Sequence, residues 1–400
     1  MKSYLLIWLT CLLEFSLPRS LCAQEIQKDS LSSVAQKDLI DVVIKATKWE
    51  KKEKARETKK INFSLIPLAA SNGGSGKVVV SSVNAAFYLG DPDTTNLSNV
   101  YFIPYTNFSS RAGFIIRPTL WLSENTWNFI GELRIATNQL NTYGLGTNSS
   151  NEIESVVSFN HARTYLTANR LILGNFYTGI GYNLDHFYDI AETDTKDGSS
   201  SFSSYTTGTG ESITSSGITF NLLRDSRKNS INPAKGFYTG LSYKICSPTL
   251  GSTSSWTSLY YDMRKYFSMN SEGHHILALW AIYWGTYGEV PYFNLPGTAL
   301  DLYGRTGRGY LYGRYRGKQM LYAECEYRFD ISSNGFWGGV VFANAQSYTE
   351  PVTNNFQYVR PAAGLGLRVK FNKKSDMNMT FDVAFGKDSF NWYINLGEFF

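Results

Sequence analysis

Charged and apolar side chains alternate along residues 321–329, directly after a loop at 301–317 that is rich in Gly, Arg and Tyr. Successive side chains of a β-strand point to opposite faces of the sheet. Glu324, Glu326 and Arg328 therefore share one face, and the other face is apolar. Polar side chains inside and apolar side chains outside are typical of a transmembrane barrel, the inverse of a soluble protein.

The alternation continues from Ile61 to the last residue and divides into strands. The predicted strands are 61–70, 76–88, 99–108, 111–122, 127–136, 153–166, 171–187, 217–224, 236–246, 255–267, 274–287, 318–329, 337–346, 358–371, 377–386 and 391–400. Their number is even, as in single-chain bacterial barrels. The sequence predicts an all-β fold, a 16-stranded antiparallel transmembrane β-barrel over residues 61–400 with a short N-terminal helical extension.

Strand parity assigns side chains to the two faces of the wall. The predicted lumen-facing charges are Arg328, Arg360, Arg368 and Lys370, with Asp382 on the next strand. The last strand is predicted to turn Trp392, Ile394, Leu396 and Phe400 outward, with Glu398 as the exception. An Arg or Lys at the lipid midplane costs about 2–4 kcal/mol, so a one-residue slip of this register is strongly disfavoured.

Most connection lengths agree with this threading, because an outer-membrane barrel has short periplasmic turns and longer external loops. The longest connections, 188–216 and 288–317, fall outside. Two connections fit less well, since 89–98 and 225–235 are long for periplasmic turns.

The composition fits a barrel with aromatic girdles at both membrane interfaces, since the chain has 27 Tyr, 25 Phe and 9 Trp. No later segment approaches the ~20 consecutive apolar residues that a membrane-spanning helix needs. The net charge of +5 provides no broad basic surface for nucleic acid. We expect the lipid of the outer membrane to surround the barrel.

The first 60 residues have a different character. Lys2, the apolar run 4–13 and Ala23 predict a signal peptide over 1–23. A lipoprotein signal at Cys22 is the weaker alternative, because no small residue stands directly before that cysteine. Residues 24–60 are predicted to form a short periplasmic extension, an amphipathic helix with a charged tail, that could plug the barrel, dock on a partner or serve as a tether.

Several segments together resemble one protein family. GITFNLLRDSRKNSINPAKGFY at 217–238 is similar to the strand, turn and strand signature of the bacterial surface antigen family, the BamA and TamA type of outer-membrane assembly factor. TYGLG at 142–146 and the last three strands, with GLGLRVKF and TFDVAFGKDS, resemble other parts of that family. The resemblance covers about residues 61–400 and implies a barrel in the bacterial outer membrane.

The segment TGRGYLYGRYRGKQ resembles the family's long sixth external loop, which folds back into the lumen. Its Arg-Gly-aromatic motif corresponds to Arg308, Gly309 and Tyr310. A buried Arg needs acceptors, because an unpaired buried charge is costly. The family's acid on the thirteenth strand is replaced by Asn344, so we expect a carboxylate to take its place. The candidate acceptors are Asn344, Glu324, Glu326 and Asp382.

The resemblance implies a function in outer-membrane protein assembly or translocation, with other assembly subunits or client proteins as partners. Residues 24–60 are too short for one of the family's periplasmic POTRA modules, so we expect a reduced, POTRA-less member that could act as an accessory subunit. The terminal pattern Trp392, Ile394, Leu396 and Phe400 resembles the signal that the insertion machinery reads. The alternative is a narrow passive channel plugged by its long loop.

An enzyme is the least favoured class. The sequence contains neither G-x-S-x-G nor H-E-x-x-H. Its histidines, His161, His186, His274 and His275, have no recognisable metal-ligand spacing. We therefore expect no catalytic residue, no metal and no cofactor.

Overall fold

The computed structural model describes residues 36–39, 41–42, 61–73, 76–150, 152–193, 195, 200–227, 229–270, 275–373 and 376–400, with backbone alone for 61–78. All of them belong to one compact unit, Gln36–Phe400. The predicted signal peptide at 1–23 and nearly all of the predicted extension at 24–60 lie outside the described residues. No helix among the described residues is long and apolar enough to cross a membrane.

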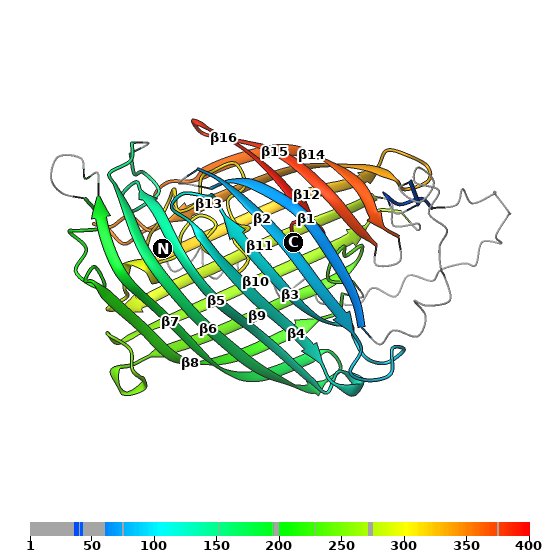
Figure 1. Cartoon of the computed structure of the whole chain (residues 1–400), viewed down its shortest axis with the longest axis horizontal. Coiled ribbons are helices and arrows are strands. Elements are labelled where there is room, and N and C mark those ends of the chain that lie inside the picture. The colour runs from blue at the N-terminus through cyan, green and yellow to red at the C-terminus, as the bar shows by residue number, and fades with distance from the viewer. Residues whose placement is uncertain are drawn as a thin grey trace, which may run out of the picture. The chain divides into compact units, whose positions relative to one another are not determined.

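The described unit is an antiparallel β-sheet that curves into a barrel (Figure 1). The strands are β1 (Ile61–Gly73), β2 (Gly76–Phe87), β3 (Ser98–Thr106), β4 (Ala112–Trp121), β5 (Trp127–Thr142), β6 (Ser155–Leu173), β7 (Phe176–Thr193), β8 (Ser212–Asp225), β9 (Gly236–Cys246), β10 (Trp256–Ser268), β11 (His275–Gly288), β12 (Gln319–Asp330), β13 (Trp337–Tyr348), β14 (Arg360–Asn372), β15 (Met377–Gly386) and β16 (Ser389–Leu396). Most predicted boundaries agree with these to within a few residues.

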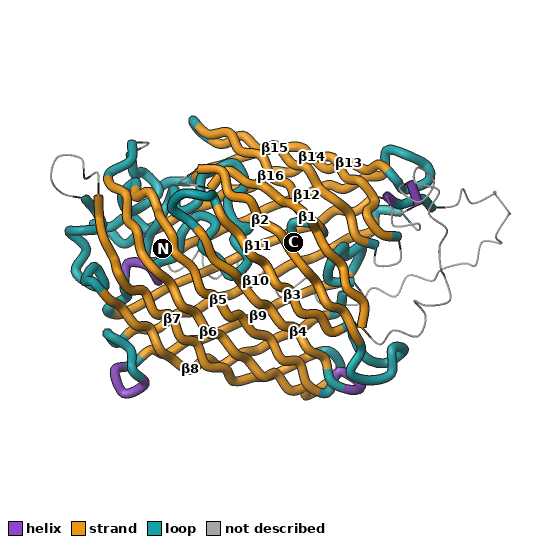
Figure 2. The backbone as a smooth tube through the Cα atoms, viewed as in Figure 1, coloured by secondary structure: helices purple, strands orange, loops and turns teal. Residues whose placement is uncertain are grey.

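Each strand pairs with its neighbour in the sequence, so the wall follows chain order. Figure 2 shows the strands as a nearly continuous wall, with loops gathered at the strand ends. β1 and β2 pair along most of their length, whereas β1 and β16 are joined by the single pair Ser71 and Tyr393. The wall is also uneven, since β6 has 19 residues and β16 has 8.

Side-chain exposure follows the predicted parity. On β12, Glu324 and Glu326 are buried inside the barrel while Leu321 and Tyr327 are exposed on the outer surface. The same holds on β14, where Arg368 is buried and Leu365 is exposed. Inward polar and outward apolar side chains therefore define a wall that matches lipid on its outside.

The two connections that seemed long for turns have folded structures of their own. In 88–97, Thr95 accepts a hydrogen bond from the Glu124 amide (3.1 Å), next to the 3-10 helix η3 (Ser123–Asn125). In 226–235, Asn232 donates to the Asp376 backbone carbonyl and to its carboxylate, both at 3.1 Å. Both connections therefore contact other turns at the same end of the barrel, which we call the turn end. Two further 3-10 helices are η5 (Pro248–Leu250) and η6 (Tyr292–Asn294).

The described part of the N-terminal extension contacts the turn end. Asp38 caps a short helical turn, since its carboxylate accepts from the Asp41 amide (2.8 Å). The Lys373 amide donates to Asp38 (3.0 Å), and its ammonium donates to Asp41 (2.6 Å). The hydrogen bond to Asp41 raises the pKa of Lys373. The chain before β1 is thus tied to the turn between β14 and β15.

The assignment of faces can be tested with Leu365→Arg. Leu365 is 58% exposed in the middle of β14, so a charge there would enter the hydrocarbon layer. We expect the free energy of unfolding in lipid vesicles, measured by denaturant titration, to fall by about 2–4 kcal/mol. The matched control is Val352→Arg in the loop 349–359, where the side chain is 95% exposed and the change should be within about 0.5 kcal/mol. Equal effects at both positions would show that Leu365 does not face lipid.

Candidate functional site

The connection between β11 and β12, residues 289–318, lies inside the barrel and contacts opposite walls. The Leu302 carbonyl accepts from Arg117 of β4 (2.6 Å). The Tyr310 hydroxyl donates to the Pro361 carbonyl of β14 (2.6 Å). Its central side chains, including Arg308, are buried. We call residues 289–318 the lumen loop.

The turn before Arg308 is stabilised locally. One carboxylate oxygen of Asp301 accepts hydrogen bonds from the Arg305 amide (2.9 Å), the Thr306 amide (2.9 Å) and the Thr306 hydroxyl (2.8 Å). Gly309 then has φ +103°, where an L side chain is strained, and a Cβ on it would lie 2.8 Å from the Ala362 Cβ. This glycine lets the loop approach the wall closely.

Arg308 lies at the centre of a buried ion cluster. Its Nη1 donates to Asp382 of β15 (2.7 Å), and its Nη2 donates to Glu326 (2.5 Å) and to Glu324 of β12. All of these side chains are fully buried. The guanidinium carbon also lies 3.5 Å from the centroid of the Phe342 ring and 4.2 Å from that of Phe399. Charge, hydrogen bonds and ring faces together replace the water that the guanidinium has lost.

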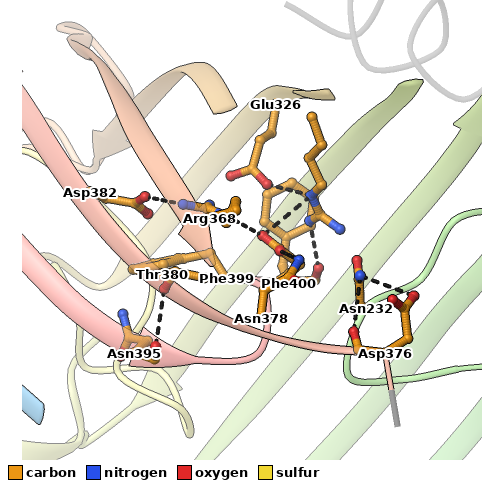
Figure 3. A network of polar contacts seen from close by, with 12 residues as sticks. Asn232, Glu326, Arg368, Asp376, Asn378, Thr380, Asp382, Asn395, Phe399 and Phe400 are labelled. Carbon is orange, nitrogen blue, oxygen red and sulfur yellow. Dashed lines mark hydrogen bonds and ion pairs between the residues drawn. The ribbon is translucent and has the colours of Figure 1, made fainter. Parts of the chain in front are cut away.

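The carboxylates of the cluster have further partners on the wall. Asp382 accepts from Arg368 of β14 (2.5 Å), as Figure 3 shows, and Glu326 accepts from Arg328 (2.6 Å). Glu324 also accepts from the Tyr322 hydroxyl. Arginines and carboxylates therefore alternate across β12, β14 and β15, which lowers the cost of burying each charge.

The other predicted lumen charges lie near the two ends of the barrel. Arg360 donates to the Thr147 carbonyl (3.0 Å) in the loop 143–154, and Lys370 pairs with Asp376 at the turn end. Among the described residues, neither side chain bonds to Arg308. Arg360 and Lys370 instead fix loops and turns that connect the strands.

Asn344 contacts Arg308 as a hydrogen-bond donor, whereas the sequence made it a candidate acceptor. Its side-chain amide donates to the Arg308 backbone carbonyl (2.9 Å), so it holds the loop backbone rather than the guanidinium. Asn344 is also directly opposite Glu324 in the β12–β13 register. Of the four candidate acceptors, the three carboxylates are the ones that accept from the Arg308 side chain.

The prediction that β16 extends outward to Phe400 is wrong. β16 ends at Leu396, and Gly397 has φ +82°, which turns the chain out of the sheet. Phe400 is 2% exposed, inside the barrel against Trp280 and Tyr266. Sequence parity assumed that the strand continued through the glycine. Trp392, Ile394 and Leu396 remain in β16, paired beside lipid-facing residues of β15.

Sequence reasoning missed residues that complete the site. The Tyr393 hydroxyl accepts from the Gly309 amide (2.9 Å), and Glu398 accepts from Arg368 (2.8 Å) and Asn378 (2.7 Å). Glu398 could have been found, because it was the exception on an otherwise apolar face. The contacts of Tyr393 and Asn378 depend on the path of the loop and the tail, which strand alternation does not determine.

The signature turn after β8 meets the same region. Asp225 pairs with Arg227 (2.8 Å), and Asn229 accepts from the Ile231 amide (2.8 Å). The Ile231 carbonyl then accepts from the Glu398 amide (3.0 Å). The turn therefore supports the C-terminal residues as well as joining two strands.

This arrangement, a lipid-facing antiparallel barrel with an inserted loop held by a buried arginine, defines a class of outer-membrane barrel. The family model described as the Omp85 superfamily domain matches residues 81–400. The chain therefore belongs to the Omp85 superfamily and to its bacterial outer-membrane barrels.

Solved structures with the same fold support this assignment. BamA from Haemophilus ducreyi, in a form lacking POTRA domains 1–3, has a TM-score of 0.54 at 16% identity, over 84% of this chain and 69% of that chain. CdiB from Acinetobacter baumannii has a TM-score of 0.53 at 12% identity, over 84% and 60%. CdiB from Escherichia coli has a TM-score of 0.54 at 9% identity, over 84% and 67%. No curated protein sequence matches the chain.

Asn344→Asp puts a carboxylate at the position where the sequence resemblance implies one, and tests whether the ion cluster tolerates a further negative charge. A carboxylate cannot donate to the Arg308 carbonyl, and it would face Glu324 directly across the strand pair. We expect the free energy of unfolding to fall by about 1–3 kcal/mol, the cost of an unsatisfied buried group. Asn344→Ala is the control that removes the amide without adding charge, and it should cost less. Stabilisation by Asn344→Asp would contradict this account.

Proposed function

We propose that this chain takes part in inserting or translocating proteins at the outer membrane, either directly or as an accessory subunit beside a larger assembly factor. The observation that carries the proposal is the lumen loop with its buried Arg308, because it joins the loop to β12, β15 and the last residues of the chain. Family membership and the likeness to BamA and CdiB support the same role.

The proposal includes the finer architecture and its orientation. The strands β1 to β16 and the β1–β16 contact support a sixteen-stranded barrel that closes in the membrane at a short seam. The long connections support an orientation in which the lumen loop enters from outside and the turn end faces the periplasm. Residues 1–23 are proposed as a cleaved signal peptide and 24–60 as a periplasmic extension, joined to the turn end through Asp38 and Asp41.

The proposed partners are client proteins, other assembly subunits and the surrounding lipid. The sequence pattern at Trp392, Ile394 and Leu396 supports a second proposal, that this strand helps the chain's own insertion. We propose that Arg308, Gly309 and Tyr310 keep the lumen loop in place while the protein takes part in insertion or translocation. A passive channel is less well supported, because the lumen loop and the C-terminal residues occupy the interior.

Depletion of the protein tests the proposed function. We expect the levels of other outer-membrane barrel proteins, measured by quantitative proteomics of purified outer membranes, to fall. Wild-type protein and Arg170→Gln, a change at an exposed arginine at the turn end of β6, should restore them. Arg308→Gln should restore them less well, since the buried carboxylates lose their cation. An unchanged outer-membrane proteome, with no assembly subunits co-purifying, would overturn the proposal.

A further inference from the structure

The last three residues, Glu398, Phe399 and Phe400, lie in a slot inside the barrel, and all three are buried. We call them the tail. The Glu398 carboxylate is held at both oxygens, by Arg368 Nε (2.8 Å) and by Asn378 Nδ2 (2.7 Å). Figure 3 shows Arg368 and Asn378 close to Phe400. The first position of the slot therefore selects an acid.

The backbone carbonyls of the tail are each bound by an arginine. Arg305 of the lumen loop donates to the carbonyls of Glu398 (3.1 Å) and Phe399 (2.7 Å). Arg328 of β12 donates to the backbone oxygen of Phe400 (3.0 Å). All three backbone oxygens of the tail therefore have a guanidinium donor.

Aromatic surfaces receive the two rings. Phe399 lies over Arg308 and in edge contact with Tyr393 (5.7 Å between ring centroids). Phe400 stacks on Trp280 at 5.1 Å. Stacked and edge-to-face ring pairs stabilise a contact beyond the burial of area. The slot is therefore complementary to an acidic residue followed by two aromatic ones.

The tail is held by side chains and by the Ile231 carbonyl of the turn after β8, rather than by a strand ladder. β16 ends at Leu396, and Gly397 turns the chain away from the sheet. A cavity of about 270 Å³ adjoins the slot at the turn end, with Arg328, Arg368 and Glu398 in its lining. The slot is thus next to open space, through which a tail could leave.

We infer that the lumen contains a binding slot for a peptide segment in which an acid precedes two aromatic residues, that the chain's own tail occupies it, and that the tail latches the lumen loop. The loop supplies Arg305 and Arg308 to the contact, and the tail covers one face of Arg308. Losing the tail removes acceptors from Arg305 and a ring from Arg308. The inference concerns the chain's own residues and does not depend on the role proposed above.

The test is peptide binding to a chain that ends at Gly397. A fluorescent peptide with the sequence of the last eight residues, YINLGEFF, is titrated into purified protein in detergent micelles, and its anisotropy is measured. We expect the truncated chain to bind and the intact chain to bind at least about 10-fold more weakly, because its tethered tail competes at high effective concentration. Peptides with Lys in place of the Glu, or with two Ala in place of the Phe pair, should bind weakly to both.

A full-length variant keeps the inference testable if the truncated chain does not fold. Glu398→Lys places a cation beside Arg368 and Arg328 and should expel the tail. Amide hydrogen exchange in residues 298–313 should become at least about 10-fold faster than in the intact protein. Glu124→Lys, the same change of charge at an exposed turn, should leave exchange there unaltered.

The outcomes separate the inference from its alternatives. Peptide binding to the truncated chain, or faster exchange in Glu398→Lys, supports the latch. A folded truncated chain that binds no peptide, or an intact chain that binds it equally well, overturns the slot. Unchanged exchange in Glu398→Lys overturns the coupling between tail and loop.

Discussion

A guanidinium group that is fully removed from water must find its partners in the protein, and this requirement organises the interior of the barrel. Arg308 is carried into the lumen by a loop, yet its acceptors come from β12 and β15. An unpaired charge in such surroundings would cost several kcal/mol. The loop is therefore stable inside only where those strands present their carboxylates at the same height, which makes the register of the wall and the position of the loop depend on each other.

The same requirement brings distant parts of the chain together. The signature turn after β8 contacts the turn between β14 and β15 through Asn232 and Asp376, and it contacts the tail through Ile231. Arg305 and Arg328 extend the cluster to Phe399 and Phe400. The tail is thus part of the interior, where Phe400 contacts Tyr266 of β10 and Trp280 of β11.

Much of the wall could be predicted from the sequence, because alternation fixes which side chains share a face and charges cannot face lipid. The acceptors Glu324, Glu326 and Asp382 followed from that parity together with the cost of burying an arginine. The path of the tail did not follow, because a glycine at 397 is compatible with both a strand and a turn. The role of Asn344 also escaped prediction, because an amide both donates and accepts and only its neighbours decide which.

The central claim is that Arg308 is coupled to the carboxylates of the wall. A double-mutant cycle with Arg308→Gln and Glu324→Gln, measured as free energies of unfolding in lipid vesicles, tests it most directly. Among the described residues, the side chains that donate to Glu324 are those of Arg308 and Tyr322. The account predicts a coupling energy of about 1–3 kcal/mol. A control cycle of Arg308→Gln with Asp225→Asn, whose partner is Arg227, should be additive. Additivity within about 0.5 kcal/mol for the Arg308 and Glu324 pair would contradict the account.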